Sequence, residues 1–232
     1  AIRRRRPQPV RRDRAGGDVM RLYSYWRSSS AWRARLALAY KRLPHELVTV
    51  HLTKGQQNEP EFRKINALGQ VPVLETEEDG APLRITQSVA IIEYLEERFP
   101  ERALLPAVRR DRARARELAE IVNSGMQPMQ NLSLQRAVEQ SGGDVSALRK
   151  QALDKGLTAL ERLASESAGR FLVRDGVTLA DIYLVPQISS ARRFDVDLEP
   201  FPTLRRVEAE CAALAEFQSA HPNAQPDFEP AV

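Results

Sequence analysis

Three short segments of the sequence combine residue types that can hold an anion. In the first, Arg27 is followed by three serines, Ser28, Ser29 and Ser30, at the start of a predicted helix. Helix N-termini carry unpaired N–H groups and a positive dipole potential, so serines there can stabilise a thiolate, an oxyanion or a phosphate. Serine is also the ordinary N-cap residue, and composition alone favours plain capping.

The other two segments are Val71-Pro72, which opens a predicted strand, and Gln87-Ser88, which begins a predicted helix. If the bond before Pro72 is cis, the backbone N–H and C=O of Val71 can point at a ligand instead of a neighbouring strand. Gln87-Ser88 is a second helix start, suited either to capping or to binding an anion. Each segment is a weak signal alone, but their order along the chain is specific.

The elements that must position these segments alternate along residues 20–99. β-branched and alternating runs predict strands at residues 21–25, 45–52, 71–75 and 83–86, and helical spacing predicts helices at 30–42, 59–66 and 87–98. The hairpin between the last two strands is expected to turn at Asp79-Gly80. The order βαβαββα predicts an α/β unit with a mixed four-stranded sheet and helices on its faces.

The second half of the chain has a helical pattern throughout. Residues 100–106 are expected to be a linker, and no convincing strand pattern follows up to about residue 214. Apolar side chains at 153, 157, 160 and 164 form a helical stripe. We therefore predict a disordered extension (1–19), an α/β domain (20–99) and an all-α domain (107–228), with residues 221–232 as an extended tail.

Thr178-Leu-Ala-Asp181 has the spacing of a capping box. Thr178 can cap the N3 amide while the Asp181 carboxylate accepts from the Thr178 N–H, and Val177 and Ile182 occupy the hydrophobic-staple positions. This motif predicts the start of a core helix and no chemistry.

The positive charge is confined to one end of the chain. The net charge is +4, but residues 1–19 hold seven Arg and two Asp, which is +5 and leaves −1 for the other 213 residues. An Arg cluster can bind nucleic acid or an anionic surface, although a disordered extension ahead of Met20 is the favoured interpretation. We expect no nucleic-acid binding by the main body.

Composition excludes several classes of site. The single cysteine, Cys211, rules out an internal disulfide framework and any multi-cysteine metal site, and the three histidines are too scattered to suggest a metal cluster. No metal is therefore expected. No apolar run approaches the roughly 20 residues of a membrane span, so a soluble, cytoplasmic protein with no membrane partner is expected.

With the helical second half, the three anion-holding segments resemble the cytosolic glutathione transferase family over residues 20–228. The sequence from Ser28 to Arg33, SSSAWR, is similar to the zeta-class signature S-S-C-x-W-R. Three further segments match that class: QSVAIIEYLEE from Gln87, QPMQNLS from Gln127, and LVPQ from Leu184 together with ARRF from Ala191. The resemblance implies a thioredoxin-like N-terminal domain with glutathione as cofactor.

The resemblance also assigns roles to individual residues. Ser28 and Ser29 would face the glutathione sulfur, with Ser28 as the hydrogen-bond donor. Glutathione contacts are implied for Ser28, Ser29, Ser30, Arg33, Gln57, Val71, Gln87, Ser88, Gln127, Asn131 and Ser133. Arg193, with Arg27 as a second candidate, would bind substrate carboxylates, and Arg193 joins the two serines as a catalytic candidate.

The implied activity is glutathione-dependent cis–trans isomerisation of maleylacetoacetate, a small dicarboxylate, in tyrosine and phenylalanine catabolism. Such a reaction needs a nucleophile that adds to a conjugated double bond, permits rotation and leaves again. Maleylpyruvate from gentisate breakdown and α-halo acids are alternative substrates. A non-catalytic binding protein on the same fold is the remote alternative.

The sequence departs from the zeta-class signature at one position, because Ser30 stands where the class has cysteine. The resemblance places the nucleophile on glutathione, so this loss need not abolish isomerisation. Cys211 falls in a late helix with no matching role. The family also implies a homodimer, with the helix near residues 109–123 as a plausible part of its interface.

Overall fold

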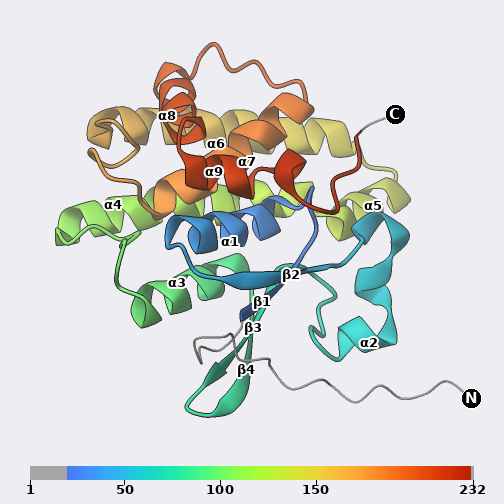
Figure 1. Cartoon of the computed structure of the whole chain (residues 1–232). Coiled ribbons are helices and arrows are strands. Elements are labelled where there is room, and N and C mark those ends of the chain that lie inside the picture. Colours follow the sequence, from blue (N-terminus) through green and yellow to red (C-terminus); the bar gives the residue numbers. More distant parts are fainter. Residues whose placement is uncertain (1–19, 231–232) are drawn as a thin grey trace, which may run out of the picture. The chain divides into compact units, whose positions relative to one another are not determined.

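The computed structural model describes residues 20–230, and the predicted Arg-rich extension of residues 1–19 lies outside them. The described chain forms two compact units. The first contains residues 20–98 and 220–230, and the second contains residues 99–219. A mixed sheet in the first unit and helices in the second confirm the predicted fold class (Figure 1).

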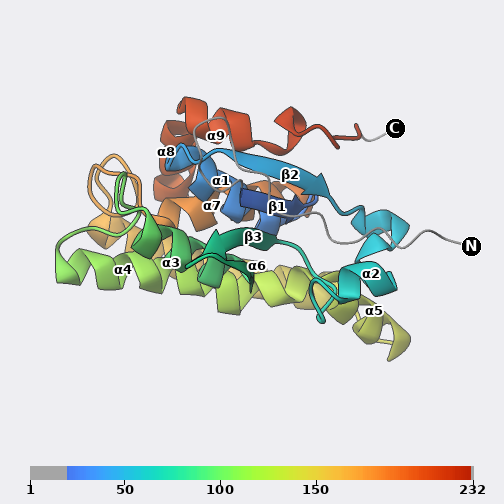
Figure 2. The same cartoon turned by 60° about the horizontal axis from the view of Figure 1, so that its bottom comes forward.

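The first unit is built on four strands in the order β2-β1-β3-β4. These strands are β1 (Met20–Ser24), β2 (His45–Thr49), β3 (Val73–Glu78) and β4 (Ala81–Thr86). The helices of this unit are α1 (Ser29–Tyr40), α2 (Pro60–Arg63) and α3 (Ser88–Arg98), with short 3₁₀ turns at Leu52–Lys54, Gln56–Asn58 and Pro222–Ala224. β1 is parallel to β2 and antiparallel to β3, so the sheet is mixed, and Figure 2 shows β1 between these two strands.

The register of the sheet brings the three sequence segments to one edge. Tyr23 in β1 pairs with Val73 in β3, and Val73 pairs with Thr86 in β4. The chain leaves β1 and β4 at this row of paired residues and enters β3 there. The serine run, Val71-Pro72 and Gln87-Ser88 are therefore all connected to the same edge of the sheet. Because β2 is parallel to β1, the loop that follows β2 also starts from this edge.

The hairpin turns at Asp79-Gly80 as predicted, but its strands are longer than expected. Both turn residues have positive φ, 51° and 76°, which suits a tight two-residue turn. β4 starts at Ala81 and contains Pro82, where the sequence suggested a start at residue 83. Proline is tolerated there because β4 is an edge strand and needs no second row of backbone hydrogen bonds.

The second unit is a helical bundle with one isolated β-bridge between Ala168 and Arg174. Its helices are α4 (Arg109–Glu120), α5 (Leu132–Gln140), α6 (Val145–Ser167), α7 (Leu179–Arg193), α8 (Pro202–Ala212) and α9 (Ala215–Ala220). A π-helical turn, Ile121–Met126, and a 3₁₀ turn, Gln127–Gln130, connect α4 to α5. The predicted stripe on α6 is fully buried at Leu153, Leu157, Leu160 and Ala164.

The predicted capping box forms at the start of α7. Asp181 is fully buried, and its carboxylate accepts hydrogen bonds from the Thr178 N–H at 2.7 Å and the Leu172 N–H at 2.9 Å. The buried carboxylate thus fixes both the helix start and the loop before it. Within residues 20–230, no helix combines the length and apolar character that crossing a membrane requires.

The C-terminal end departs from the expected extended tail. Residues 220–230 belong to the first unit and contain a 3₁₀ turn, although the sequence suggested that the helical domain continues to residue 228. The ring of His221 packs edge-on against Trp32, with centroids 5.2 Å apart. Three prolines suggest an extended chain, but such a local pattern does not indicate which surface the chain packs on.

Candidate active site

Ser28 is the N-cap of α1, as the simpler interpretation predicted. Its side-chain oxygen accepts a hydrogen bond from the Ala31 N–H at 3.2 Å. Capping uses the hydroxyl only as an acceptor, so its own proton is left to donate to a ligand. The first turn of α1 contains no acidic residue, so nothing in that turn neutralises the positive end of the helix dipole. Capping and anion binding are therefore compatible at this serine.

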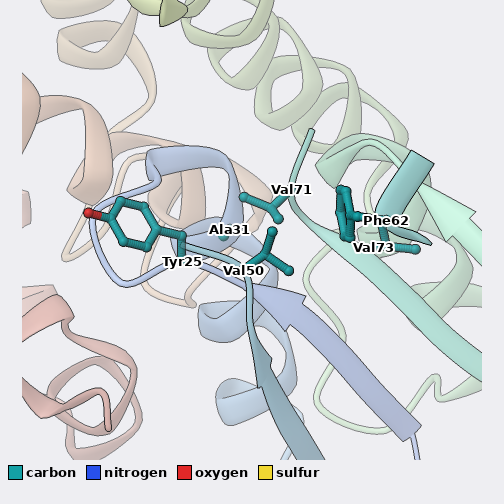
Figure 3. Close-up of a cluster of buried hydrophobic side chains, with 6 residues drawn as sticks. All are labelled: Tyr25, Ala31, Val50, Phe62, Val71 and Val73. Carbon is teal, nitrogen blue, oxygen red and sulfur yellow. The ribbon is translucent and has the colours of Figure 1, made fainter. Parts of the chain in front are cut away.

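Val71 precedes a cis peptide bond to Pro72 and is buried. Its side chain belongs to a cluster that also contains Tyr25, Ala31 and Val50, and Figure 3 shows Val71 and Val50 close to Ala31. This cluster fixes Val71 beside the first turn of α1. Val71 lies just outside β3, and within residues 20–230 no loop hydrogen bond occupies its backbone N–H or C=O.

Gln57 lies in the loop that follows β2 and is 8% exposed. Its side-chain Oε1 is buried and has no hydrogen-bond partner among the described residues. Gly69 packs against this loop, since a Cβ at its φ of +61° would clash with the Gln57 backbone carbonyl. A buried acceptor without a donor is costly, so a ligand N–H is a natural partner for Gln57.

Gln87 and Ser88 form the sharp entry into α3. Gln87 has a φ of +73°, which is uncommon for a residue other than glycine and concentrates at functional sites. Ser88 is the first residue of α3 and is 5% exposed. No hydrogen bond of its hydroxyl is found with residues 20–230. The start of α3 therefore offers a hydroxyl and helix-terminal N–H groups to an anion such as a carboxylate.

The predicted glutathione residues of the second unit lie in the turns between α4 and α5 or in the first turn of α5. Gln127 begins the 3₁₀ turn and is half-buried, Asn131 is the N-cap of α5, and Ser133 is exposed in its first turn. Gln130 and Gln187 lie in the class-matching segments QPMQNLS and LVPQ, and neither was expected to have a role of its own. Gln130 Nε2 donates to Gln187 Oε1 at 3.1 Å, and both side chains are buried. This amide pair anchors the turn that carries Gln127 and Asn131 to α7.

Arg193 lies in the last turn of α7 and is exposed. Its guanidinium carbon lies 4.7 Å from the centre of the Phe194 ring, and that of Arg149 lies 3.8 Å from the same ring. Two cations therefore gather around one aromatic side chain, an arrangement that can bind a carboxylate.

The two remaining arginine candidates have opposite environments. Arg27 is exposed in the loop before α1, where it is accessible to a charged ligand. Arg33 is fully buried in α1, so only a ligand group reaching into the interior could contact it.

Cys211 is buried in α8, and burial raises the pKa of its thiol. A thiol in such an environment is not a nucleophile at neutral pH. Among residues 20–230, no three His, Cys, Asp or Glu side chains are grouped to hold a metal ion. The helix starts at Ser28 and Ser88 support the binding of anionic organic ligands.

Family models and known proteins agree on the relationship of this sequence. Residues 18–97 match the model described as glutathione S-transferase, N-terminal domain, and residues 133–219 match glutathione S-transferase, C-terminal domain. Maleylacetoacetate isomerase of Dictyostelium discoideum is 43% identical over 90% of this chain and 96% of its own length.

Solved structures give the same relationship. Maleylacetoacetate isomerase from Anaeromyxobacter dehalogenans, with glutathione bound in its active site, is 54% identical with a TM-score of 0.84, covering 91% of this chain and 98% of its own. A zeta-class maleylpyruvate isomerase in its holo form is 41% identical with a TM-score of 0.84, covering 90% and 100%.

Proposed function

Because this chain belongs to the glutathione S-transferase family, we propose that it is a glutathione-dependent isomerase that converts maleylacetoacetate to fumarylacetoacetate. The observation that carries the proposal is the register of the sheet. It connects Ser28, Val71 and Ser88 to one edge, and each offers hydrogen-bonding capacity that residues 20–230 leave unused. A tripeptide with a thiol, two amides and two carboxylates fits this set of groups.

Glutathione, when bound, supplies the thiol nucleophile that adds to a conjugated double bond and leaves again. The Ser28 hydroxyl and the positive end of α1 would favour the thiolate form of its sulfur. We assign Ser29 and Ser30 to the same helix start, Val71 to the cysteinyl backbone, Gln57 to the opposite end of the tripeptide, and Gln87 with Ser88 to the γ-glutamyl carboxylate. Arg33, Gln127, Asn131 and Ser133 complete the proposed glutathione residues.

Arg27 and Arg193 are proposed to bind substrate carboxylates. Negative charge develops next to these carboxylates when a nucleophile adds to the double bond, and guanidinium groups stabilise such charge. Arg149 beside the Phe194 ring adds positive potential around Arg193. A homodimer and a cytoplasmic location remain predictions from the family resemblance.

Direct assays test the activity. We expect the purified enzyme to convert maleylacetoacetate only when glutathione is present. The loss of substrate absorbance measures this conversion. Maleylpyruvate serves as the competing substrate, because a maleylpyruvate isomerase is among the similar structures. Faster turnover of maleylpyruvate would move the assignment to that reaction. Glutathione binding without turnover of either compound, or of an α-halo acid, would indicate a non-catalytic binding protein.

Ser88→Ala should weaken glutathione binding. Loss of a hydroxyl hydrogen bond to a charged carboxylate costs about 1.5–3 kcal/mol, so Kd should rise by about 10- to 100-fold while kcat at saturating glutathione changes little. Calorimetric titration measures this Kd. Ser165→Ala is a matched control, because the Ser165 hydroxyl donates to the Arg162 carbonyl at 2.7 Å on α6. Equal affinities of the two variants would contradict the role of Ser88.

Arg193→Ala should raise KM for the dicarboxylate by about 10- to 100-fold, because a bidentate arginine–carboxylate pair is lost. Affinity for glutathione should stay unchanged. Arg192→Ala is the matched control: Arg192 is the preceding residue of α7, and its guanidinium already pairs with Glu208. Steady-state kinetics compare the two variants, and equal KM values would remove Arg193 from the substrate site.

A further inference from the structure

Two side chains that have no assigned role hold the loop immediately before Ser28. One is Arg35, in the middle of α1, and the other is Asp227, in the C-terminal segment (residues 220–230). All of these residues belong to the first unit. In Figure 1 the red C-terminal segment runs beside the start of α1.

Arg35 is 2% exposed and donates hydrogen bonds to several groups of this loop. Its Nη1 donates to Ser24 Oγ at 2.9 Å and to the Tyr25 carbonyl at 3.2 Å, and its Nη2 donates to the Trp26 carbonyl at 3.1 Å. Its Nε donates to the Ala220 carbonyl at 3.2 Å. One buried guanidinium thus joins the end of β1, the loop before Ser28 and the start of the C-terminal segment.

Asp227 holds the same loop from the other side. Its Oδ2 accepts a hydrogen bond from the Trp26 N–H at 3.0 Å. The next residue, Phe228, packs its ring edge-on against the Trp26 ring, with centroids 5.0 Å apart. Both backbone polar groups of Trp26 are therefore engaged by side chains, its N–H by Asp227 and its C=O by Arg35.

The charge of Asp227 favours the charged form of the buried Arg35 guanidinium. Burial lowers the pKa of Arg35 to about 10, and the negative charge of Asp227 acts in the opposite direction. A buried cation needs a nearby anion to offset its desolvation. Loss of the Asp227 carboxylate would remove its hydrogen bond with the Trp26 N–H. It would also weaken the hydrogen bonds of Arg35 to the loop, because the anion that stabilises the buried guanidinium is gone.

We propose that Arg35 and Asp227 are positioning residues that set the orientation of the Ser28 hydroxyl, and that the C-terminal segment is thereby part of the catalytic apparatus. Ser28 follows Trp26 by two residues, and its N–H donates to the Tyr25 carbonyl at 3.0 Å. A shift of the Trp26 peptide therefore moves Ser28 directly. Misplacement of a catalytic group by about 1 Å can reduce rates by about 100-fold.

The inference rests on the proposed role of Ser28, so the test reads the thiol of bound glutathione as well as turnover. For Asp227→Ala we expect kcat to fall by about tenfold, with the Kd for glutathione within about threefold of wild type. The pKa of the bound thiol, followed by thiolate absorbance in the ultraviolet, should rise toward its value in solution.

Asp227→Asn keeps an oxygen that can accept from the Trp26 N–H but removes the charge, so its kcat should lie between those of wild type and Asp227→Ala. Glu229→Gln is the matched control: it removes one negative charge from the same C-terminal segment, where the Glu229 carboxylate contacts His51 and Lys54, and it should leave both readouts unchanged. If Asp227→Ala does not fold, a clear difference between Asp227→Asn and Glu229→Gln carries the same test.

One result would overturn this inference alone, and a different result would overturn the proposed function as well. If both Asp227 variants lower only the melting temperature, with wild-type kcat and thiol pKa, the pair is purely structural and the inference fails alone. If wild-type protein neither binds glutathione nor lowers its thiol pKa, the proposed function fails and takes the inference with it.

Discussion

Replacing Ser28 with alanine should lower kcat/KM by about 100-fold or more, because one hydrogen-bond donor to the negative charge of the thiolate is lost. The pKa of the bound glutathione thiol should rise, since only the α1 dipole and backbone N–H groups then favour the thiolate. Thiolate absorbance measured across a pH titration follows this change directly. Affinity for glutathione should fall less than the rate does.

The change also removes the α1 N-cap, which costs about 1 kcal/mol of stability. Ser28→Thr separates the two effects, because threonine retains both the cap and the hydroxyl and should recover most of the activity. Ser165→Ala is the matched control, because Ser165 is exposed on α6 and its hydroxyl donates to the Arg162 carbonyl, and we expect full activity. A Ser28→Ala enzyme with wild-type kcat/KM would remove Ser28 from the reaction.

Much of the first unit was predictable because its elements are set by local patterns. The Asp79-Gly80 turn and the alternating strands were predicted, and the resulting register brings the serine run, Val71 and Ser88 to one edge. α2 is shorter than predicted because the Asn66 side chain binds the Leu68 N–H and the Gln70 carbonyl, which favours a turn over a helix.

Two contacts near the proposed site that the sequence did not predict are long-range. Asp227 binds Trp26 across 201 residues, and Gln130 binds Gln187 across 57. Nothing in the spacing of these residues indicates a partner, because burial and pairing arise only after the elements have packed. The role of Ser28 as a cap was predictable from its position, whereas its loop's dependence on the C-terminal segment was not.

Asp181→Ala should have the largest effect on stability. The change leaves the Leu172 and Thr178 N–H groups buried without an acceptor, at about 1–3 kcal/mol each, and removes the capping box. We expect a loss of about 3–5 kcal/mol in the free energy of unfolding, a large share of the stability of a domain. Urea unfolding followed by circular dichroism measures it.

This effect should depend on pH in a defined direction. Burial raises the pKa of Asp181 from 3.8 to about 6, so between these values the folded protein binds the proton more tightly than the unfolded chain. Stability contributed by the protonated group is therefore fully present below pH 4 and is lost as the pH rises through 6. The stability difference between wild type and Asp181→Ala should shrink over that interval.

Asp144→Ala is the matched control, because Asp144 also caps a helix but is exposed. Its Oδ1 accepts from the Ala147 N–H at 2.9 Å at the start of α6, and its loss should cost only about 1 kcal/mol. Burial, more than capping itself, would then account for the larger effect at Asp181. Equal destabilisation by the two substitutions would contradict this account. So would a stability difference between wild type and Asp181→Ala that grows as the pH rises from 4 to 6.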